Sequence, residues 1–169
     1  MELLLIIDMQ NVYLPDSPWA CEGILEAADS IKKLIPQFNH VAFTLFDPPL
    51  DPKGQWCLYN KENKAINEDD WMNAPLDVLM PYMHENNTYH KSTYAFNDPM
   101  LEDYDTVYIA GVVAECCVLS TIFSLIDQGK KVIVLEDAIV GENKQKVEEI
   151  KDIMQGLSPL HIEFKRSRD

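Results

Sequence analysis

The chain has 169 residues, of which 47% are hydrophobic, and this size and composition suit one domain over residues 1–169 with a single core. Its 28 Asp and Glu outnumber its 14 Lys and Arg, so the formal net charge is −14 at pH 7. A surface of this sign repels nucleic-acid phosphates and anionic lipid, and we expect neither nucleic acid nor a membrane as a partner.

The chain opens on MELLLIID, in which Asp8 ends an apolar run of five residues that no basic residue precedes. The run is too short for a membrane span and lacks the pattern of a signal peptide. The four cysteines (Cys21, Cys57, Cys116 and Cys117) have no paired metal-ligand spacing, and they predict reduced thiols in the cytoplasm. A disulfide between the adjacent Cys116 and Cys117 would require distorted local geometry, so we do not expect one.

The first part of the chain has a strand, helix, strand pattern. Residues 3–7 (LLLII) form an apolar run of strand length. Residues 23–35 carry apolar side chains at helical spacing, and Pro36 follows where such a helix ends. Residues 40–46 again have the length and composition of a strand. This order predicts parallel strands that are joined through a helix.

The pattern lapses between Asp47 and Asn73, where Pro, Asn, Asp and Lys predominate and two Trp and a Tyr are interspersed. Long connections in compact α/β domains are often functional. We expect an ordered loop here, either as a lid over a site or as a contact in an oligomer. The alternative is a variable surface insertion.

The remainder of the chain resumes the alternation of strands and helices. Gly129 stands where a helix C-cap belongs. Strands are predicted at residues 106–110, 132–135 and 162–164, and helices at residues 117–128 and 142–154. The whole pattern predicts an α/β fold in which helices cover both faces of a parallel sheet.

Three polar side chains follow predicted strands, which is where ligands bind in open α/β sheets. Asp8 ends the run LLLII, Lys91 ends the short segment TYHK, and Cys117 follows TVYIAGV at a predicted helix start. Taken singly, each has a plain structural interpretation: a turn cap, a solvated cation and a small buried hydrophobe. Together they predict a rim on which one acid, one base and one thiol converge.

This combination predicts nucleophilic catalysis by Cys117. A helix N-terminus and a neighbouring ammonium both lower the pKa of a thiol, which makes a nucleophile at neutral pH. Unpaired backbone N–H groups at the same turn can hold the oxyanion of a tetrahedral intermediate. Asp8 can orient the Lys91 ammonium or shuttle the proton.

Three motifs of the chain resemble those of isochorismatase-like cysteine hydrolases. Residues 111–121 (GVVAECCVLST) resemble the family pattern in which a glycine precedes the cysteine by six residues and a threonine follows it by four. The segment IDMQN around Asp8 resembles the opening motif of the family, and residues 90–96 (HKSTYAF) resemble its central lysine motif. The motifs occur in the family order over residues 1 to about 137.

The resemblance implies a Rossmann-like, doubly wound, mostly parallel sheet and a catalytic triad of Asp8, Lys91 and Cys117. It selects Cys117 rather than Cys116 as the nucleophile, because the family cysteine stands six residues after the glycine at position 111. It also implies a small-molecule substrate and a homo-oligomer, either a dimer or a tetramer.

The resemblance further implies a cis peptide between Val112 and Val113, so that the backbone amides of Val113 and Cys117 form an oxyanion hole. Around these residues we expect a substrate pocket. The side chains that we expect to line it are Gln10, Tyr13, Trp56, Tyr94 and Phe96.

The chain departs from the family pattern at several positions. Ala114 stands where threonine is usual, residues 12–13 (Val-Tyr) replace Asp-Phe, and the segment 91–96 is one residue short. Nicotinamidase-like members hold a divalent metal through a D-x-H motif and a second His, whereas this chain has no His between His40 and His84. We therefore expect no metal and no cofactor, and nicotinamide is disfavoured as a substrate.

Three classes of function remain open. The first is an amidase that cleaves an amide or related C–N bond through a covalent thioester-type intermediate. Relatives that cleave a vinyl ether often lack the cysteine, so Cys117 favours this class. The second is a thiol module in which Cys116 and Cys117 sense oxidant. The third is a degenerate member that serves as an interaction scaffold, which Ala114 and the short central motif favour.

Overall fold

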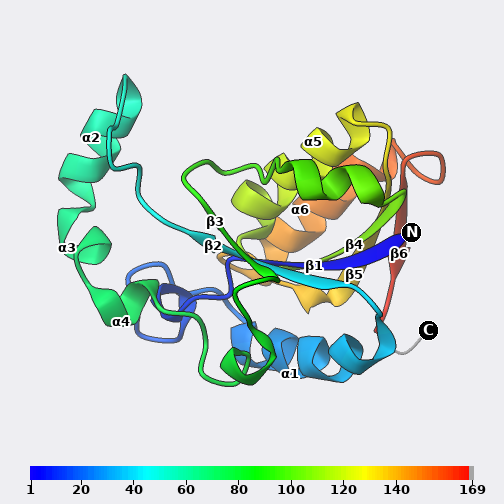
Figure 1. The fold of residues 1–169 in the computed structure, drawn as a ribbon, viewed down its shortest axis with the longest axis horizontal. Helices are drawn as coiled ribbons and strands as arrows, with labels where there is room; N and C mark the ends of the chain where they lie inside the picture. The colour runs from blue at the N-terminus through cyan, green and yellow to red at the C-terminus, as the bar shows by residue number, and fades with distance from the viewer. Residues whose placement is uncertain (168–169) are drawn as a thin grey trace.

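The computed structural model describes residues 1–167 and contains a six-stranded sheet (Figure 1). All neighbouring strands pair in parallel, in the order β3-β2-β1-β4-β5-β6. This order is that of a doubly wound, Rossmann-like sheet, and it confirms the predicted fold class. The strands are β1 (Glu2–Ile7), β2 (Val41–Phe46), β3 (Thr88–Lys91), β4 (Thr106–Gly111), β5 (Lys131–Ile139) and β6 (Ile162–Lys165).

Strand β1 lies in the middle of the sheet, between β2 and β4. Its residues 3–7 are all buried, because helices cover both faces of the sheet. Alternate side chains enter the two cores: Leu4 and Ile6 pack on one face, and Leu3, Leu5 and Ile7 on the other. A strand that is buried on both faces needs an uninterrupted apolar run, which β1 has.

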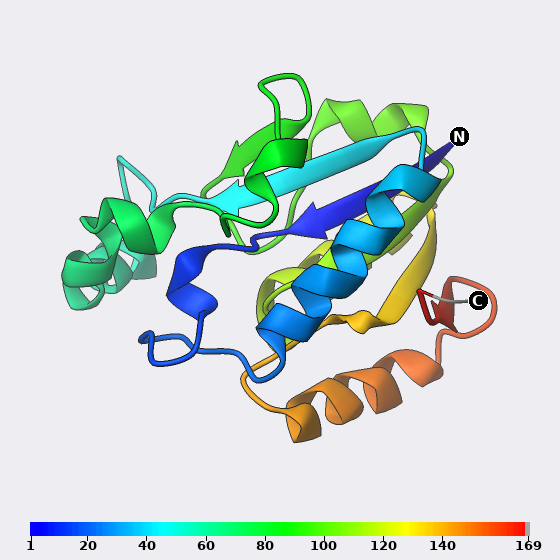
Figure 2. The same cartoon turned by 90° about the horizontal axis from the view of Figure 1, so that it is seen from below.

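Helix α1 (Ile24–Leu34) crosses one face of the sheet, as the view from below shows (Figure 2). Helices α5 (Leu119–Asp127) and α6 (Lys144–Gln155) cover the opposite face (Figure 1). Each helix buries an apolar stripe at helical spacing against the strands. In α1 the stripe consists of Ile24, Ala27, Ala28, Ile31 and Leu34.

The predicted strands and helices are confirmed, with shifts at their ends. The clearest shift is at Cys117, because α5 begins at Leu119 and a π-helical turn, η5 (Ala114–Val118), precedes it. Gly129 ends α5 as predicted, with φ +79° and its N–H donated to the Ile126 carbonyl. Short 3-10 turns are η1 (Asn11–Tyr13), η2 (Ile35–Gln37), η3 (Met80–Tyr82) and η4 (Pro99–Asp103). None of the helices in residues 1–167 is long and apolar enough to cross a membrane.

The prediction of a loop for residues 47–73 is wrong in part, because the segment contains three short helices. These are α2 (Gln55–Glu62), α3 (Lys64–Asn67) and α4 (Asp70–Asn73), and both ribbon views place them beyond the carboxyl ends of the strands. None of their residues is fully buried, so they carry no apolar stripe that periodicity could reveal. Polar contacts hold them together with the packing of Ile66 and Met72 against the core: the Asp69 carboxylate caps α4, and the Asn73 side chain donates to the Ile66 carbonyl at 2.8 Å.

Strands β1 and β4 approach each other closely at Gly111, which pairs with Ile7. Gly111 has φ +113°, and a Cβ atom added there would overlap the backbone carbonyl and nitrogen of Ile7. Backbone atoms in the middle of a sheet cannot give way as a flexible side chain can. Only glycine therefore fits between the end of β1 and the turn that carries Cys117.

We predict that Gly111→Ala lowers the free energy of unfolding by about 3 kcal/mol or more, because it adds a backbone clash to an unfavourable φ. Gly129→Ala is the matched control, since Gly129 also has a positive φ but nothing within 4 Å of an added Cβ. Its loss should be smaller, about 1 to 2 kcal/mol. Urea unfolding of the two variants and the parent chain measures the difference, and equal losses would contradict the account of the clash.

Candidate active site

Asp8 directly follows β1 and is completely buried. Its φ of +50° is a left-handed conformation that residues other than glycine adopt infrequently, and such conformations cluster at functional sites. The Asp8 N–H donates to the Thr44 carbonyl (3.0 Å), and the Thr44 hydroxyl donates to Asp8 Oδ1 (2.6 Å). Thr44 pairs with Ile7 across β1 and β2, so the register of the sheet positions the carboxylate.

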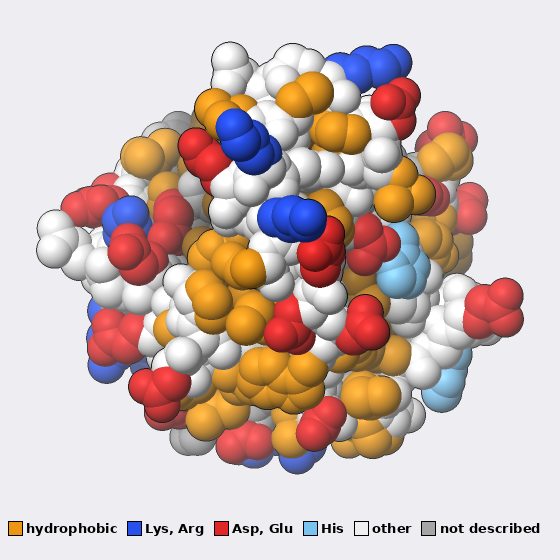
Figure 3. Space-filling model, turned by 90° about the vertical axis from the view of Figure 1, so that its left-hand side faces the viewer, with side chains coloured by type: hydrophobic (Ala, Val, Ile, Leu, Met, Phe, Trp, Pro, Cys, Tyr) orange, Lys and Arg blue, Asp and Glu red, His pale blue; other side chains and the backbone are white. Residues whose placement is uncertain are grey.

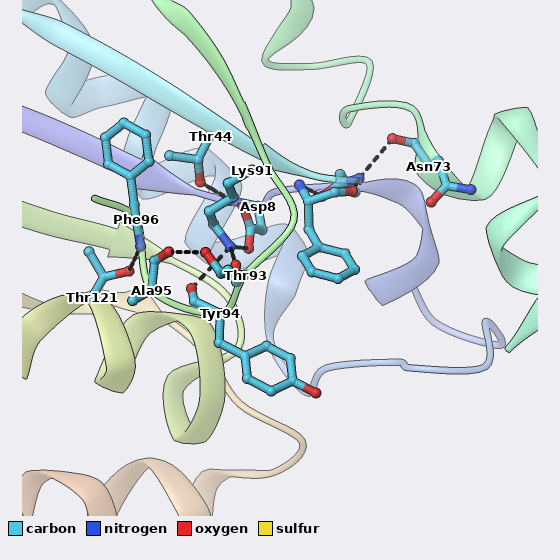
Figure 4. A network of polar contacts seen from close by, with 11 residues as sticks. Asp8, Thr44, Asn73, Lys91, Thr93, Tyr94, Ala95, Phe96 and Thr121 are labelled. Atoms are coloured by element: carbon cyan, nitrogen blue, oxygen red, sulfur yellow. Dashed lines mark hydrogen bonds and ion pairs between the residues drawn. The ribbon is translucent and has the colours of Figure 1, made fainter. Parts of the chain in front are cut away.

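Lys91 ends β3 and reaches past the end of β2 to Asp8 (Figure 4). Its Nζ lies 2.7 Å from Asp8 Oδ2, and the two side chains are only 5% and 0% exposed. The same Nζ donates to the carbonyls of Thr93 (2.9 Å) and Tyr94 (3.1 Å). Two of its three N–H groups are thus used in hydrogen bonds, while Asp8 Oδ2 pairs with its charge and, within residues 1–167, has no hydrogen-bond partner. The predicted meeting of Asp8 and Lys91 is thus present as a buried ion pair.

The segment that carries Cys117 follows β4, the strand beside β1 on the other side. The peptide bond between Val112 and Val113 is cis, as predicted. The Ala114 N–H donates to the Val140 carbonyl (2.9 Å), which ties the turn to the segment after β5. Cys117 lies in the π-helical turn η5 and is 4% exposed.

The adjacent thiols have opposite pKa shifts. The hydrogen bond with Cys116 raises the pKa of Cys117 well above its usual range, and burial and the Asp8 carboxylate raise it further, while Lys91 lowers it. The same hydrogen bond lowers the pKa of Cys116, and Lys91 contributes to that lowering. The Cys116 hydrogen bond, burial and Asp8 together outweigh the Lys91 charge in this direction, and the predicted Cys117 thiolate of the resting protein stays a prediction.

A cavity of about 460 Å³ has Cys117 in its wall, a volume that suits a small molecule. Aromatic rings form much of the remaining wall, and they come from η1, the loop before α1, the end of β2, α2 and the segment after β3. The lining residues are Tyr13, Pro18, Trp19, Ala20, Cys21, Phe46, Tyr59, Asn63, Tyr94, Val113, Glu115, Cys116, Cys117 and Glu142.

Two of the five predicted pocket residues, Tyr13 and Tyr94, line this cavity. Trp56 does not: its ring lies behind the wall, against Tyr94 (5.2 Å between ring centroids) and Tyr59 (5.1 Å). Phe46, which Trp56 also contacts, is the ring that faces the cavity there. Trp56 therefore supports the wall rather than forming it.

Gln10 and Phe96 are also outside the cavity wall, which corrects the prediction for both. Gln10 is buried and bonds with the backbone: its Nε2 donates to the carbonyl of Asn73 (2.8 Å), and its Oε1 accepts from the Phe46 N–H (2.9 Å). It thereby ties the end of β2 to α4. Phe96 is buried in the core below α5, where its N–H donates to the Thr121 hydroxyl (3.0 Å; Figure 4).

Sequence reasoning missed several residues of the wall, among them Trp19, Tyr59, Glu115 and Glu142. Trp19 and Tyr59 lie in segments without periodicity, and only the tertiary structure brings them to the thiol. Glu115 stands two residues before Cys117 in the motif, so its closeness in sequence to the predicted nucleophile could have indicated it. Glu142 reaches the cavity from the loop between β5 and α6, for which the sequence held no signal.

The residues around this site do not fit the metal centre of nicotinamidase-like proteins. In residues 1–167, no three His, Cys, Asp or Glu side chains are arranged to hold a metal ion. His90, the histidine beside the central lysine, pairs instead with Asp47 at 2.6 Å on the exposed side. The imidazole and carboxylate ligands that such a centre needs are therefore not assembled here.

The fold recurs in solved structures of hydrolases. An isochorismatase-like hydrolase from Alkaliphilus metalliredigens has a TM-score of 0.77 at 18% identity, over 99% of this chain and 94% of that one. N-carbamoylsarcosine amidase from Thermoplasma acidophilum has a TM-score of 0.75 at 20% identity, over 99% of this chain and 97% of that one. A nicotinamidase from Bacillus subtilis has a TM-score of 0.78 at 17% identity, over 98% of this chain and 99% of that one. At these identities the likeness shows the fold alone.

A comparison with curated protein sequences found no match. The model of the isochorismatase domain family, in contrast, matches residues 2–158, which is most of the chain and includes all three predicted motifs. With the sheet order and the Asp8, Lys91 and Cys117 positions described above, this match establishes that the chain belongs to the isochorismatase family of hydrolases.

Proposed function

We propose that this hydrolase cleaves an amide or related C–N bond of a small molecule, with Cys117 as the nucleophile. The observation that carries the proposal is the buried Asp8–Lys91 ion pair next to a thiol in the wall of a cavity of small-molecule size. A buried ion pair is costly to desolvate and is weak evidence for stability, so a role in chemistry is the better explanation for its presence.

In the proposed first step, Asp8 takes the proton of the Cys117 thiol while the sulfur attacks the carbonyl carbon of the substrate. This assignment follows from the raised pKa of Cys117, because a protonated thiol is a poor nucleophile. Asp8 Oδ1 is bound by Thr44, and Oδ2 faces Lys91, so the carboxylate is held in one orientation. A base in fixed geometry is what general-base catalysis requires.

The attack makes a tetrahedral intermediate, for which we assign the backbone amides of Val113 and Cys117 as the oxyanion hole. Both residues belong to the cavity wall. When the intermediate collapses, the C–N bond breaks, Asp8 returns its proton to the departing nitrogen, and the acyl group remains on Cys117 as a thioester. Water then attacks the thioester, with Asp8 as the base, and releases the acid and the free thiol.

Lys91 has two proposed roles, which are to hold Asp8 and to lower the pKa of the thiol. Its ammonium is fixed by the Thr93 and Tyr94 carbonyls as well as by Asp8. A fixed positive charge favours the thiolate that develops as Cys117 reacts. Lys91 thus stabilises the charged state without becoming a proton donor in the cycle.

Two further parts of the proposal concern assembly and location. The predicted homo-oligomer is consistent with the exposure of Leu58 (48%) and Trp71 (56%) on the α2–α4 segment. Figure 3 shows the end of the molecule at which this segment lies, with hydrophobic and acidic side chains gathered together on it. Large exposed apolar side chains mark surfaces that a partner can cover. The cytoplasmic location and the number of subunits stay predictions.

We predict that Cys117→Ala lowers turnover by about 10³-fold or more, as nucleophile deletions do. Ammonia release from a set of small amides, ureido and carbamoyl compounds measures turnover, and circular dichroism checks that the variant is folded. Cys116→Ala is the matched control and should retain turnover. If only Cys116→Ala loses turnover, Cys116 is the nucleophile. If both variants keep full activity, the thiol mechanism is refuted.

We predict that Lys91→Met moves the pH profile of Cys117 alkylation upward by at least about one pH unit and abolishes turnover. The sign follows because Lys91 lowers the pKa of Cys117. Asp8 raises the same pKa, so the double variant Asp8→Asn/Lys91→Met should move the profile back toward that of the parent chain. Lys91→Arg should not restore turnover fully, since the wider guanidinium does not fit a site built around a compact ammonium. An unchanged profile in Lys91→Met would remove Lys91 from the site.

We predict that turnover persists after exhaustive treatment with a chelator, because a thiol nucleophile needs no Lewis acid and the nicotinamidase ligand set has no counterpart in this chain. The assay is ammonia release before and after chelation. Activity that disappears with the chelator and returns with zinc, iron or manganese would refute this expectation and restore the nicotinamidase assignment.

A further inference from the structure

The charges around the cavity are all of one sign. Glu115 and Glu142 line it, and none of its lining residues, all of which lie within residues 1–167, is Lys, Arg or His. A substrate with a carboxylate or phosphate group would meet no cation on this wall. Fixed charges of one sign in a partly enclosed space concentrate ligands of the other sign.

Glu115 holds its negative charge in a fixed place. Its Oε1 accepts from the Glu142 N–H at 3.0 Å. Its Oε2 is buried and, within residues 1–167, has no hydrogen-bond partner. The carboxylate packs against Gly141, where an added Cβ would overlap Oε2. Within residues 1–167 Glu115 makes no direct ion pair, although its charge raises the pKa of Lys146, and it also acts on a group that enters the cavity.

Glu142 contributes less, because it is 62% exposed and pairs with Lys146 at 2.7 Å. Water and the Lys146 ammonium both weaken the field of its carboxylate. Both carboxylates nevertheless act on a group in the same wall: burial first, and then Glu115 and Glu142, raise the pKa of Cys21 to about 12. The two carboxylates therefore act on the part of the wall that contains Cys21.

The Lys91 ammonium acts on the wall at Cys116 and Cys117, whose pKa values it lowers, but its charge is already paired with the Asp8 carboxylate at 2.7 Å. It is buried, it is not among the lining residues, and two of its N–H groups donate to the carbonyls of Thr93 and Tyr94. An anionic group on a substrate would have to displace one of these acceptors to reach it. The buried pair thus presents no free cation to the cavity.

The aromatic rings of the wall add a second attraction for positive charge. Trp19 lies between Tyr13 (6.2 Å between ring centroids) and Tyr59 (6.5 Å), and all three line the cavity. Ring faces carry a negative potential that attracts ammonium and guanidinium groups, with Trp the strongest. The rings also exclude water, which strengthens the attraction between a cation and the carboxylates.

We propose that the substrate carries a positively charged ammonium or guanidinium group in addition to the scissile C–N bond, and that Glu115 is the main residue that selects it. This inference rests on the proposed function of Cys117. A cationic amide would place its carbonyl at Cys117 and its charged end among Trp19, Tyr59 and the two glutamates. Anionic amides of the same size would be excluded.

The test compares the reaction of Cys117 with three methanethiosulfonates that carry a trimethylammonium, a hydroxyl or a sulfonate group on the same ethyl stem. In each case the thiolate attacks the sulfenyl sulfur, a mixed disulfide forms and methanesulfinate leaves. Tandem mass spectrometry locates the label on Cys117, and each rate constant is divided by that of 2-mercaptoethanol with the same reagent. Glu115→Gln and Glu142→Gln remove the wall charges and keep the side-chain shape. Glu26→Gln is the matched control, because Glu26 is exposed on α1 outside the cavity.

We expect the normalised rate of the cationic reagent to exceed that of the anionic one by about tenfold or more, with the neutral reagent between them. The ratio should fall by about threefold or more in Glu115→Gln, fall less in Glu142→Gln, and stay unchanged in Glu26→Gln. A ratio of one or below, or a ratio that both cavity variants leave unchanged, would overturn this inference while the nucleophile assignment stands. Absence of label on Cys117 with all three reagents would overturn the nucleophile assignment, and this inference with it.

Discussion

The ion pair between Asp8 and Lys91 is the interaction on which the organisation of this site depends. Its two members come from β1 and β3, which do not touch, and β2 between them supplies Thr44 to hold the carboxylate. Loss of one partner would leave an uncompensated buried charge, which typically costs about 3 to 5 kcal/mol. Three strands must therefore keep one register for the pair to exist, and the parallel sheet is the frame that keeps it.

The close approach of β1 and β4 also determines the surroundings of the Cys117 thiol. Gly111 lets β4 approach β1 without a side chain between them, and the turn that follows brings Cys117 to the Asp8 carboxylate. In that position burial and a neighbouring negative charge disfavour the thiolate more than one ammonium favours it. This environment is the reason for which we propose Asp8 as the base that takes the proton of Cys117.

The cavity wall brings together segments that are far apart in the chain. Rings and carboxylates from η1, the loop before α1, α2, η5 and the loop after β5 meet around the thiol. The segment α2–α4 has no core of its own and is tied to the sheet through Gln10 and Asn73. In the function that we propose, this wall contributes to the choice of substrate and the ion pair below it to the breaking of the bond.

What the sequence determined by itself was the sheet and the position of each residue that we propose as catalytic. The run LLLII, the helical stripe from Ile24 to Leu34 and the polar residues after the strands have local causes, namely period, capping and burial, and these are visible in a single sequence. The cis peptide at Val112 followed only from the motif resemblance. Tertiary structure alone decided the rest: that Gln10 and Phe96 lie outside the cavity wall, that Trp19, Tyr59 and Glu142 reach the cavity, and that burial and Asp8 help to raise the pKa of Cys117. The physical reason is that a pKa and a cavity wall depend on neighbours distant in the chain, and hydrophobic periodicity carries no information about polar segments such as α2–α4 that bury no stripe.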